Sequence, residues 1–85
     1  MSKSLRKARM NAYLLKMLRK QHAVSNLSQE ALAEKLDLSS RACSALENGK
    51  SGFSAISFMM LFTLFPKEER ISLFIGLCET LELST

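Results

Sequence analysis

Apolar and basic positions alternate along the first part of the chain with the spacing of an α-helix. The apolar positions, three and four residues apart, are Leu14, Leu15 and Leu18. A second set, at intervals of seven and four residues, consists of Arg9, Lys16 and Lys20. Side chains at these spacings share one side of a helix, so residues 4–22 are expected to form a helix with a packing face and a basic face. Residues 23–26 break the pattern and are expected to form a loop.

A short second helix is predicted to begin after Ser28. This serine precedes the run Gln29-Glu30-Ala31-Leu32, where its hydroxyl would accept from free N–H groups and Glu30 would lie at the positive helix end. Leu32 and Leu36 stand one turn apart, and the helix is expected to stop near residues 37–38.

Ser39 is expected to cap a third helix, which runs to Asn48 and ends at Gly49, where a left-handed residue is needed. Cys43 and Leu46 of this helix are predicted to face the core. The positions expected on its outside are Ser40, Arg41, Ser44 and Ala45. Two short helices separated by three or four residues make a helix-turn-helix by their spacing alone.

The C-terminal part is predicted to form two apolar helices. Ser54 can cap the fourth, which is apolar nearly all round: Ile56, Phe58, Met59, Met60, Leu61, Phe62, Leu64 and Phe65. Pro66 is expected to open the fifth at a first-turn position. The fifth helix carries one stripe of Ile71, Phe74, Ile75 and Cys78, widened by Leu73, Leu77 and Leu81. Because one stripe can cover the core while the surplus is exposed, residues 54–83 are expected to supply both core and a dimer or partner interface.

Length and composition favour one small helical domain over residues 1–85. Chains use roughly 100 to 200 residues per domain, so 85 residues leave no room for a second core. A content of 47% hydrophobic and 24% charged residues excludes a disordered chain. No stretch alternates as a strand would, and the longest apolar stretch, 58–65 broken by Thr63, is about half a membrane span.

The net charge of +4 is unevenly distributed along the chain. The first 29 residues carry seven basic side chains and no acidic one: Lys3, Arg6, Lys7, Arg9, Lys16, Arg19 and Lys20. The remainder is acidic overall and holds all five phenylalanines in its last 33 residues. A basic part beside an apolar part suggests an anionic polymer on one side and a protein contact on the other.

The chain offers little chemistry for catalysis or for metal binding. Cys43 and Cys78 lie 35 residues apart without a Cys/His cluster, so neither a zinc site nor a disulfide framework is indicated. Both are expected to pack as apolar side chains, and His22 is expected to be a surface cation at a helix end. Without paired carboxylates, a Cys/His couple or a Gly-rich phosphate loop, we expect no enzyme and no cofactor. A cytoplasmic location is the default for such a chain.

A family resemblance is carried by three runs of residues. These are the run Leu27-Ser28-Gln29-Glu30-Ala31-Leu32-Ala33-Glu34-Lys35-Leu36, the pair Leu38-Ser39 and the run Leu46-Glu47-Asn48-Gly49-Lys50. Together they resemble the Cro/CI-type (XRE) helix-turn-helix family of DNA-binding repressors. The resemblance implies an all-α, five-helix, lambda-repressor-like domain with its helix-turn-helix at about 28–48.

The resemblance also implies roles for particular residues. Gln29 and Asn48 would each bind a DNA phosphate, Gln29 through its amide and the helix N-terminus. The candidate base contacts at the start of the third helix are Ser40, Arg41, Ser44 and Ala45, and Ser39 is a further DNA-binding candidate. Arg41 is the main candidate for specificity, because a guanidinium can bond both O6 and N7 of a guanine. Lys50 and Arg9 are further candidate phosphate contacts, and Glu47 would pair with Arg19 to brace two helices.

Arg41 is the only large polar side chain among these candidate base contacts, so dimerisation or operator shape is expected to add to its affinity. The resemblance therefore implies a homodimer on a palindromic operator, acting as a repressor of its own operon. The arrangement of Ser54, Phe58, Met59, Leu61 and Phe62 is loosely similar to HipB-type antitoxins, which also bind a toxin. An antitoxin, a restriction-modification controller and a phage repressor therefore remain alternatives.

Overall fold

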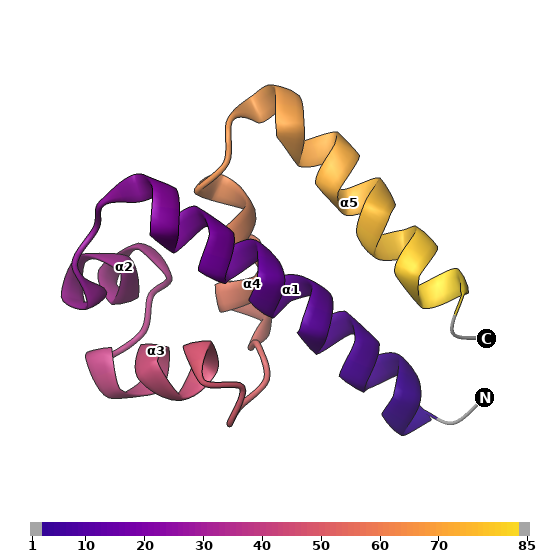
Figure 1. The fold of residues 1–85 in the computed structure, drawn as a ribbon, viewed down its shortest axis with the longest axis horizontal. Coiled ribbons are helices and arrows are strands. Elements are labelled where there is room, and N and C mark those ends of the chain that lie inside the picture. Colours follow the sequence, from indigo (N-terminus) through magenta and orange to yellow (C-terminus); the bar gives the residue numbers. More distant parts are fainter. Residues whose placement is uncertain (1–2, 84–85) are drawn as a thin grey trace.

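The computed structural model describes residues 3–83, which form five α-helices and no strand (Figure 1). In chain order these are α1 (Lys3–Ser25), α2 (Gln29–Lys35), α3 (Ser40–Glu47), α4 (Ala55–Thr63) and α5 (Lys67–Glu82). The predicted all-α architecture and its five helices are thereby confirmed. None of these helices, within the described range, is long and apolar enough to cross a membrane.

α1 is longer than its hydrophobic pattern predicts. It continues through residues 23–25, which were expected to belong to a loop, and the reversal of the chain falls at Asn26, whose φ is 58°. The hydroxyl of Ser25 donates to the carbonyl of His22 at 3.2 Å and so satisfies one acceptor of the last turn. The prediction of a loop at 23–26 was wrong because Ala23 and Val24 contain no stop signal, while an asparagine can take the left-handed conformation that ends a helix.

Serine caps define the starts of the next three helices, as predicted. The hydroxyl oxygens of Ser28, Ser39 and Ser54 each accept from the backbone N–H three residues later, at 3.1, 3.1 and 3.2 Å. α3 ends before Gly49, which has the expected left-handed φ of 73°. Pro66 differs from the prediction: its ψ of 148° is extended, so it occupies the N-cap position and α5 begins at the following residue.

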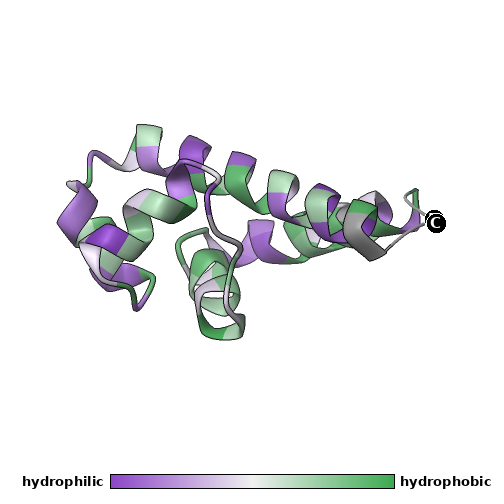
Figure 2. Cartoon of the chain, turned by 90° about the horizontal axis from the view of Figure 1, so that it is seen from below, coloured by the Kyte–Doolittle hydropathy of each residue, from purple (hydrophilic) through white to green (hydrophobic). Residues whose placement is uncertain are grey.

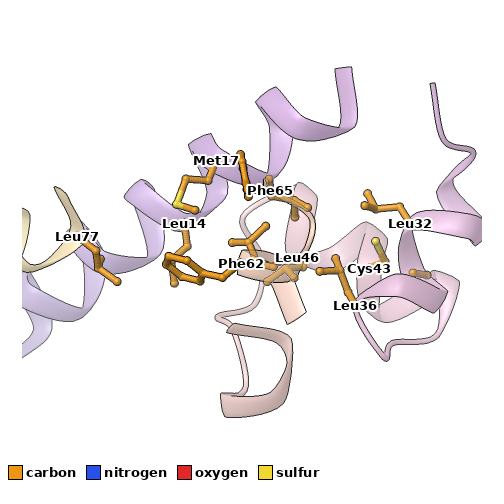
Figure 3. Packing of buried hydrophobic residues seen from close by; sticks show 12 residues of the cluster. Leu14, Met17, Leu32, Leu36, Cys43, Leu46, Phe62, Phe65 and Leu77 are labelled. Carbon is orange, nitrogen blue, oxygen red and sulfur yellow. The ribbon is translucent and has the colours of Figure 1, made fainter. Parts of the chain in front are cut away.

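A single apolar core joins all five helices (Figure 3). Its largest fully buried side chains are Leu14, Leu18, Leu32, Leu36, Leu61 and Cys43. Leu46 is also buried, so both α3 residues predicted to face inward do so. Figure 3 shows Leu32, Leu36 and Cys43 gathered between α2 and α3. The two short helices are therefore held in place by a shared apolar layer.

α5 packs antiparallel to α1, which brings the two ends of the described chain to the same side of the molecule (Figure 1). The hydroxyl of Tyr13 on α1 donates to the carbonyl of Leu73 on α5 at 2.8 Å. Gly76 lies directly beneath this hydroxyl, and a Cβ added there would overlap it. The close approach of α1 and α5 at this point therefore requires a glycine.

Arg70 ties the start of α5 to the end of α4. Its Nε donates to the carbonyls of Phe62 and Phe65 at 3.1 and 3.0 Å, and its Nη2 donates to the carbonyl of Thr63 at 3.2 Å. The carbonyls of Thr63 and Phe65 lie at and beyond the end of α4, where intrahelical donors are missing, whereas that of Phe62 also accepts from the backbone N–H of Phe65 at 3.2 Å. A positive group at a helix C-terminus is also favoured by the helix dipole.

Candidate nucleic-acid interface

α2 and α3 form a helix-turn-helix whose turn spans residues 36–39. The C-cap of α2 is Leu36, and Asp37 takes a positive φ of 60°, which reverses the chain between the helices. The buried hydroxyl of Ser57 on α4 donates to the carbonyl of Leu36 at 3.3 Å. The turn is therefore fixed by its own dihedrals and by a contact from α4.

The outer side of α3 carries the predicted base-contacting residues, and Ser39 precedes them as the N-cap. Ser39, Ser40 and Arg41 are exposed, whereas Ser44 and Ala45 are half-buried. These positions lie opposite Cys43 and Leu46, which point into the core, so the start of α3 presents Arg41 to solvent. The Ser39 hydroxyl is occupied as the helix cap.

Asn48 and Lys50 extend this surface beyond the end of α3, and both are exposed. Lys50 borders a hollow of about 270 Å³, lined by Asn11, Ala12 and Leu15 of α1, by Leu46 of α3 and by residues 49–53. Arg9 is exposed one turn before these α1 residues, in the part of α1 that runs beside α5. It shares the outward basic face of α1 with Lys16 and Lys20, which are also exposed.

A polar cluster connects the ends of α1, α2 and α3. Nδ1 of His22 lies 2.7 Å from Oε2 of Glu47, and Nε2 of His22 lies 3.0 Å from the carbonyl oxygen of Leu27. The other carboxylate oxygen of Glu47 accepts from Nε2 of Gln29 at 2.5 Å. The side chains of His22 and Glu47 are only 26% and 16% exposed, so this pair is shielded better than a surface ion pair.

The partner predicted for Glu47 was only half right. Arg19 does reach Glu47, but its Nε and Nη2 donate to the backbone carbonyl, at 3.1 and 2.7 Å, rather than to the carboxylate. The carboxylate is bound instead by His22, which stands one helical turn later on α1. His22 is therefore an interhelical contact: it stands in the last turn of α1, as predicted for a cation at a helix end, but it is half-buried and not at the surface. α1 remains helical past this residue, which directs the ring toward α3 instead of into a loop.

Two pKa shifts follow from this cluster. The hydrogen bond to Glu47 raises the pKa of His22 above its usual value, as does the bond to the Leu27 carbonyl, while burial lowers it. Burial raises the pKa of the Cys43 thiol, the charge of Glu47 raises it further, and a hydrogen bond from Gln29 lowers it. Cys43 is fully buried and keeps its proton at neutral pH, so it packs as an apolar side chain, as expected.

A family model described as Helix-turn-helix matches residues 15–64, from the middle of α1 to just past the end of α4. The chain belongs to the Cro/CI-type (XRE) helix-turn-helix family. It is thus a DNA-binding transcriptional regulator. Searches of curated proteins and of solved structures gave no match.

The DNA-binding residues predicted for this XRE-type regulator differ in where the structure places them. The structure brings Gln29 and Glu47 into direct contact, and it places Arg41 and Asn48 on the outside of the same helix-turn-helix. Arg9 lies outside the matched segment. Among residues 3–83, no group of three or more His, Cys, Asp or Glu side chains is placed to hold a metal ion.

Sequence reasoning missed the part that His22 plays in this XRE-type fold. The residue stands three positions after Arg19, so both share one face of α1 if the helix continues past residue 22. The absence of a stop residue at 23–25 was the available signal, because it extends the helix far enough for His22 to face Glu47.

Proposed function

We propose that this XRE-type regulator is a sequence-specific repressor that binds a palindromic operator as a homodimer and controls its own operon in the cytoplasm. The observation that carries the sequence-specific part is the exposure of Arg41 on the outer side of α3. Both α3 and the preceding α2 begin at a serine cap. Arg41 would read a guanine in the major groove, beside Ser39, Ser40, Ser44 and Ala45.

Phosphate contacts would hold α3 in the groove. Gln29 and Asn48 are proposed to bind the backbone on either side of α3, with Lys50 and Arg9 as additional contacts. The support is their position: Asn48, Lys50 and Arg9 are exposed, and Gln29 lies at the N-terminus of α2. These contacts fix orientation without reading sequence, so sequence preference would depend on α3 alone.

The test of this mechanism is duplex binding with a salt titration. We expect the logarithm of the binding constant to fall linearly and steeply with the logarithm of the salt concentration, because phosphate contacts release counterions. Arg41→Ala should lose about 1–3 kcal/mol of preference among duplexes. Arg41→Lys is the matched control, since it keeps the charge and the salt slope but loses the paired guanine bonds. Sequence preference unchanged in both variants would contradict the proposal.

An exposed apolar surface supports the homodimer. We call this surface the α4–α5 apolar face; its exposed members are Ile56, Met59, Ile71, Phe74 and Ile75. A hollow of about 310 Å³ lies between the two helices, lined by Phe58, Met59, Phe62, Arg70, Ile71 and Phe74. Figure 2 shows that α4 is hydrophobic around most of its circumference. A second copy would cover this face and set two α3 helices about one turn of DNA, roughly 34 Å, apart.

Solution mass tests the dimer. Ile71 is 72% exposed on the α4–α5 apolar face, and Val24 is 68% exposed at the end of α1. Ile71→Asp would lose about 2 kcal/mol of apolar burial in the dimer, which corresponds to roughly 30-fold weaker association. Val24→Asp makes a comparable change elsewhere and should leave the dimer intact. Equal masses for the two variants at every concentration would contradict a dimer built on this face.

The same face supports a second candidate function, that of an antitoxin. If the unmodified chain is a monomer at tens of micromolar while it still binds DNA, the α4–α5 apolar face would belong to a different protein. Co-purification with the products of neighbouring genes then tests whether that protein is a toxin.

A further inference from the structure

The hollow of about 270 Å³ beside Lys50 lies between α1 and the loop that follows α3 (Figure 1). We call it the α1–loop hollow; its walls are Asn11, Ala12 and Leu15 of α1, Leu46 of α3 and residues 49–53. Among these lining residues Lys50 is the only charged one, and none is acidic. The hollow is therefore a positive site directly beyond the end of the helix that carries Arg41.

The side-chain amide of Asn11 packs against the loop in this hollow. A Cβ built on Gly52 would lie 3.2 Å from Nδ2 and 3.3 Å from Oδ1 of Asn11. The amide is half-buried, yet it forms no hydrogen bond within residues 3–83. Buried polar groups usually have a partner, and an amide nitrogen carries two donor hydrogens. An anion in the hollow would supply the acceptor that the described chain does not.

The backbone of the loop adds further donors. The N–H of Lys50 donates to the carbonyl of Ala45 at 2.9 Å and so closes the end of α3. In the described part of the chain, the N–H groups of residues 51–53 have no such acceptor. Successive free N–H groups favour the binding of anions, and the absence of a side chain at Gly52 lets a ligand approach the backbone closely.

A second hollow continues the positive surface along α1. Ala12 and Leu15 also line this hollow, which has a volume of about 600 Å³. Its charged walls are Lys16, Arg19 and Lys20. Two hollows that share two walls are adjacent, and no acidic residue lines either of them. A line of positive groups over several turns of α1 suits a polymer of phosphates better than a single small anion.

We infer that the α1–loop hollow binds one phosphate of the DNA backbone, next to the base pairs that α3 would read, through the Asn11 amide and the Lys50 ammonium group. The inference rests on the proposed placement of α3 in the major groove. Asn11 lies before the segment 15–64 that matches the family model, so membership of the family does not imply this contact. A phosphate contact adds affinity that is the same for every sequence.

The first experiment measures duplex binding over a salt series, with the preferred duplex selected from random sequences. Asn11→Ala and Lys50→Gln should each weaken binding to all duplexes by roughly fivefold to tenfold, because each removes a donor to a charged group. Lys50→Gln should also lower the salt slope by about one, whereas Asn11→Ala should keep the slope.

Lys67→Gln is the matched control for charge, since Figure 1 shows the start of α5 on the other side of the molecule from α3. It should leave affinity close to that of the unmodified chain. Alanine favours the helix more than asparagine does, so Asn11→Ala should fold, and urea unfolding checks this. Unchanged affinity of folded Asn11→Ala overturns the inference.

A second experiment locates the phosphate. Neutral methylphosphonate groups replace the phosphates of the preferred duplex one at a time. At one position beside the base pairs read by α3, the replacement should weaken binding of the unmodified chain by roughly tenfold. It should have little further effect on the variant that combines Asn11→Ala with Lys50→Gln, because the partners of that phosphate are already gone. Equal losses in the two proteins at every position would overturn the contact.

Two further outcomes separate this inference from its alternatives. If Arg41→Ala loses sequence preference while Asn11→Ala binds as the unmodified chain does, the inference fails and the proposed function stands. Inorganic phosphate is the probe for a free anion: saturable shifts of the Asn11 amide resonances, together with unchanged DNA affinity of Asn11→Ala, would assign the hollow to a small anion and overturn the DNA contact. Absence of salt-dependent duplex binding by the unmodified chain contradicts the proposed function itself.

Discussion

The contact between Tyr13 and Gly76 predicts a substitution whose effect on stability changes sign with its background. In the unmodified chain, a Cβ at position 76 overlaps the Tyr13 hydroxyl, which donates to the Leu73 carbonyl. Tyr13→Phe removes this hydroxyl, and the nearest remaining atom of the ring, Cζ, lies 3.3 Å from the added Cβ. Gly76→Ala should therefore destabilise the first background and be tolerated in the second.

The magnitudes follow from three contributions. Overpacking costs about 1–3 kcal/mol, and the loss of the Tyr13 hydrogen bond costs about 1 kcal/mol. Replacing a glycine by alanine inside a helix gains about 1 kcal/mol. Gly76→Ala should thus cost about 1–3 kcal/mol in the unmodified chain. In Tyr13→Phe only the helix gain and a small packing term remain, so the same substitution should be neutral or stabilising by up to about 1 kcal/mol.

Urea denaturation of the four proteins at one protein concentration measures this coupling. A difference of about 2 kcal/mol moves the midpoint by roughly 1–2 M urea for a domain of this size, and the melting temperature by roughly 8–16 °C. Equal costs of Gly76→Ala in the two backgrounds would refute the packing of α1 on α5 at this point, since a double-mutant cycle isolates the contact.

Three other predictions concern stability. Arg70→Ala should lower the free energy of unfolding in denaturant by about 1–3 kcal/mol, because it removes the side-chain donors that bind the carbonyls at the end of α4. An ammonium group cannot reproduce the forked geometry of the guanidinium, so full stability in Arg70→Lys would contradict this prediction. Ser39→Ala should cost about 1 kcal/mol through loss of the α3 cap, whereas Ser39→Asp should keep most of the stability, and an equal loss in both would argue against a capping role. Because the pKa of His22 in the folded protein is raised, its stabilising contribution is complete below about pH 6.5 and is lost as pH rises through the folded pKa. The melting temperature of the unmodified chain should therefore fall more between pH 6 and 8.5 than that of His22→Gln. The same change of melting temperature with pH in both proteins would contradict this prediction.

Local chemistry made the helix starts predictable. Ser28, Ser39 and Ser54 each stand three residues before the N–H that they cap, so their effect is contained within one turn of sequence. The end of α1 was not predicted, because it depends on the left-handed conformation of Asn26 and not on a break in apolar periodicity. Pro66 was misplaced by one position for a similar reason, since its extended ψ leaves it outside the helix.

The contact between α1 and the carboxylate of Glu47 was predicted one helical turn too early, at Arg19 instead of His22. Arg19 and His22 both lie on the side of α1 that faces α3, and only the tertiary position of the helices decides which one meets the carboxylate. For α5, the sequence showed more apolar positions than the core needs. The structure buries Leu77 and leaves Ile71 and Phe74 exposed, a choice set by the rotation of α5 that places Gly76 against Tyr13.

The brevity of α2 and α3 determines how this domain can be re-engineered. They contain 7 and 8 residues, whereas isolated helices below roughly 12–15 residues are marginal in water. Their order comes from the layer formed by Leu32, Leu36, Cys43 and Leu46. A synthetic peptide of the helix-turn-helix should therefore be unstructured, and a transplanted α3 would lose its shape. New operator preferences are better obtained by randomising positions 40, 41 and 44 within the intact chain.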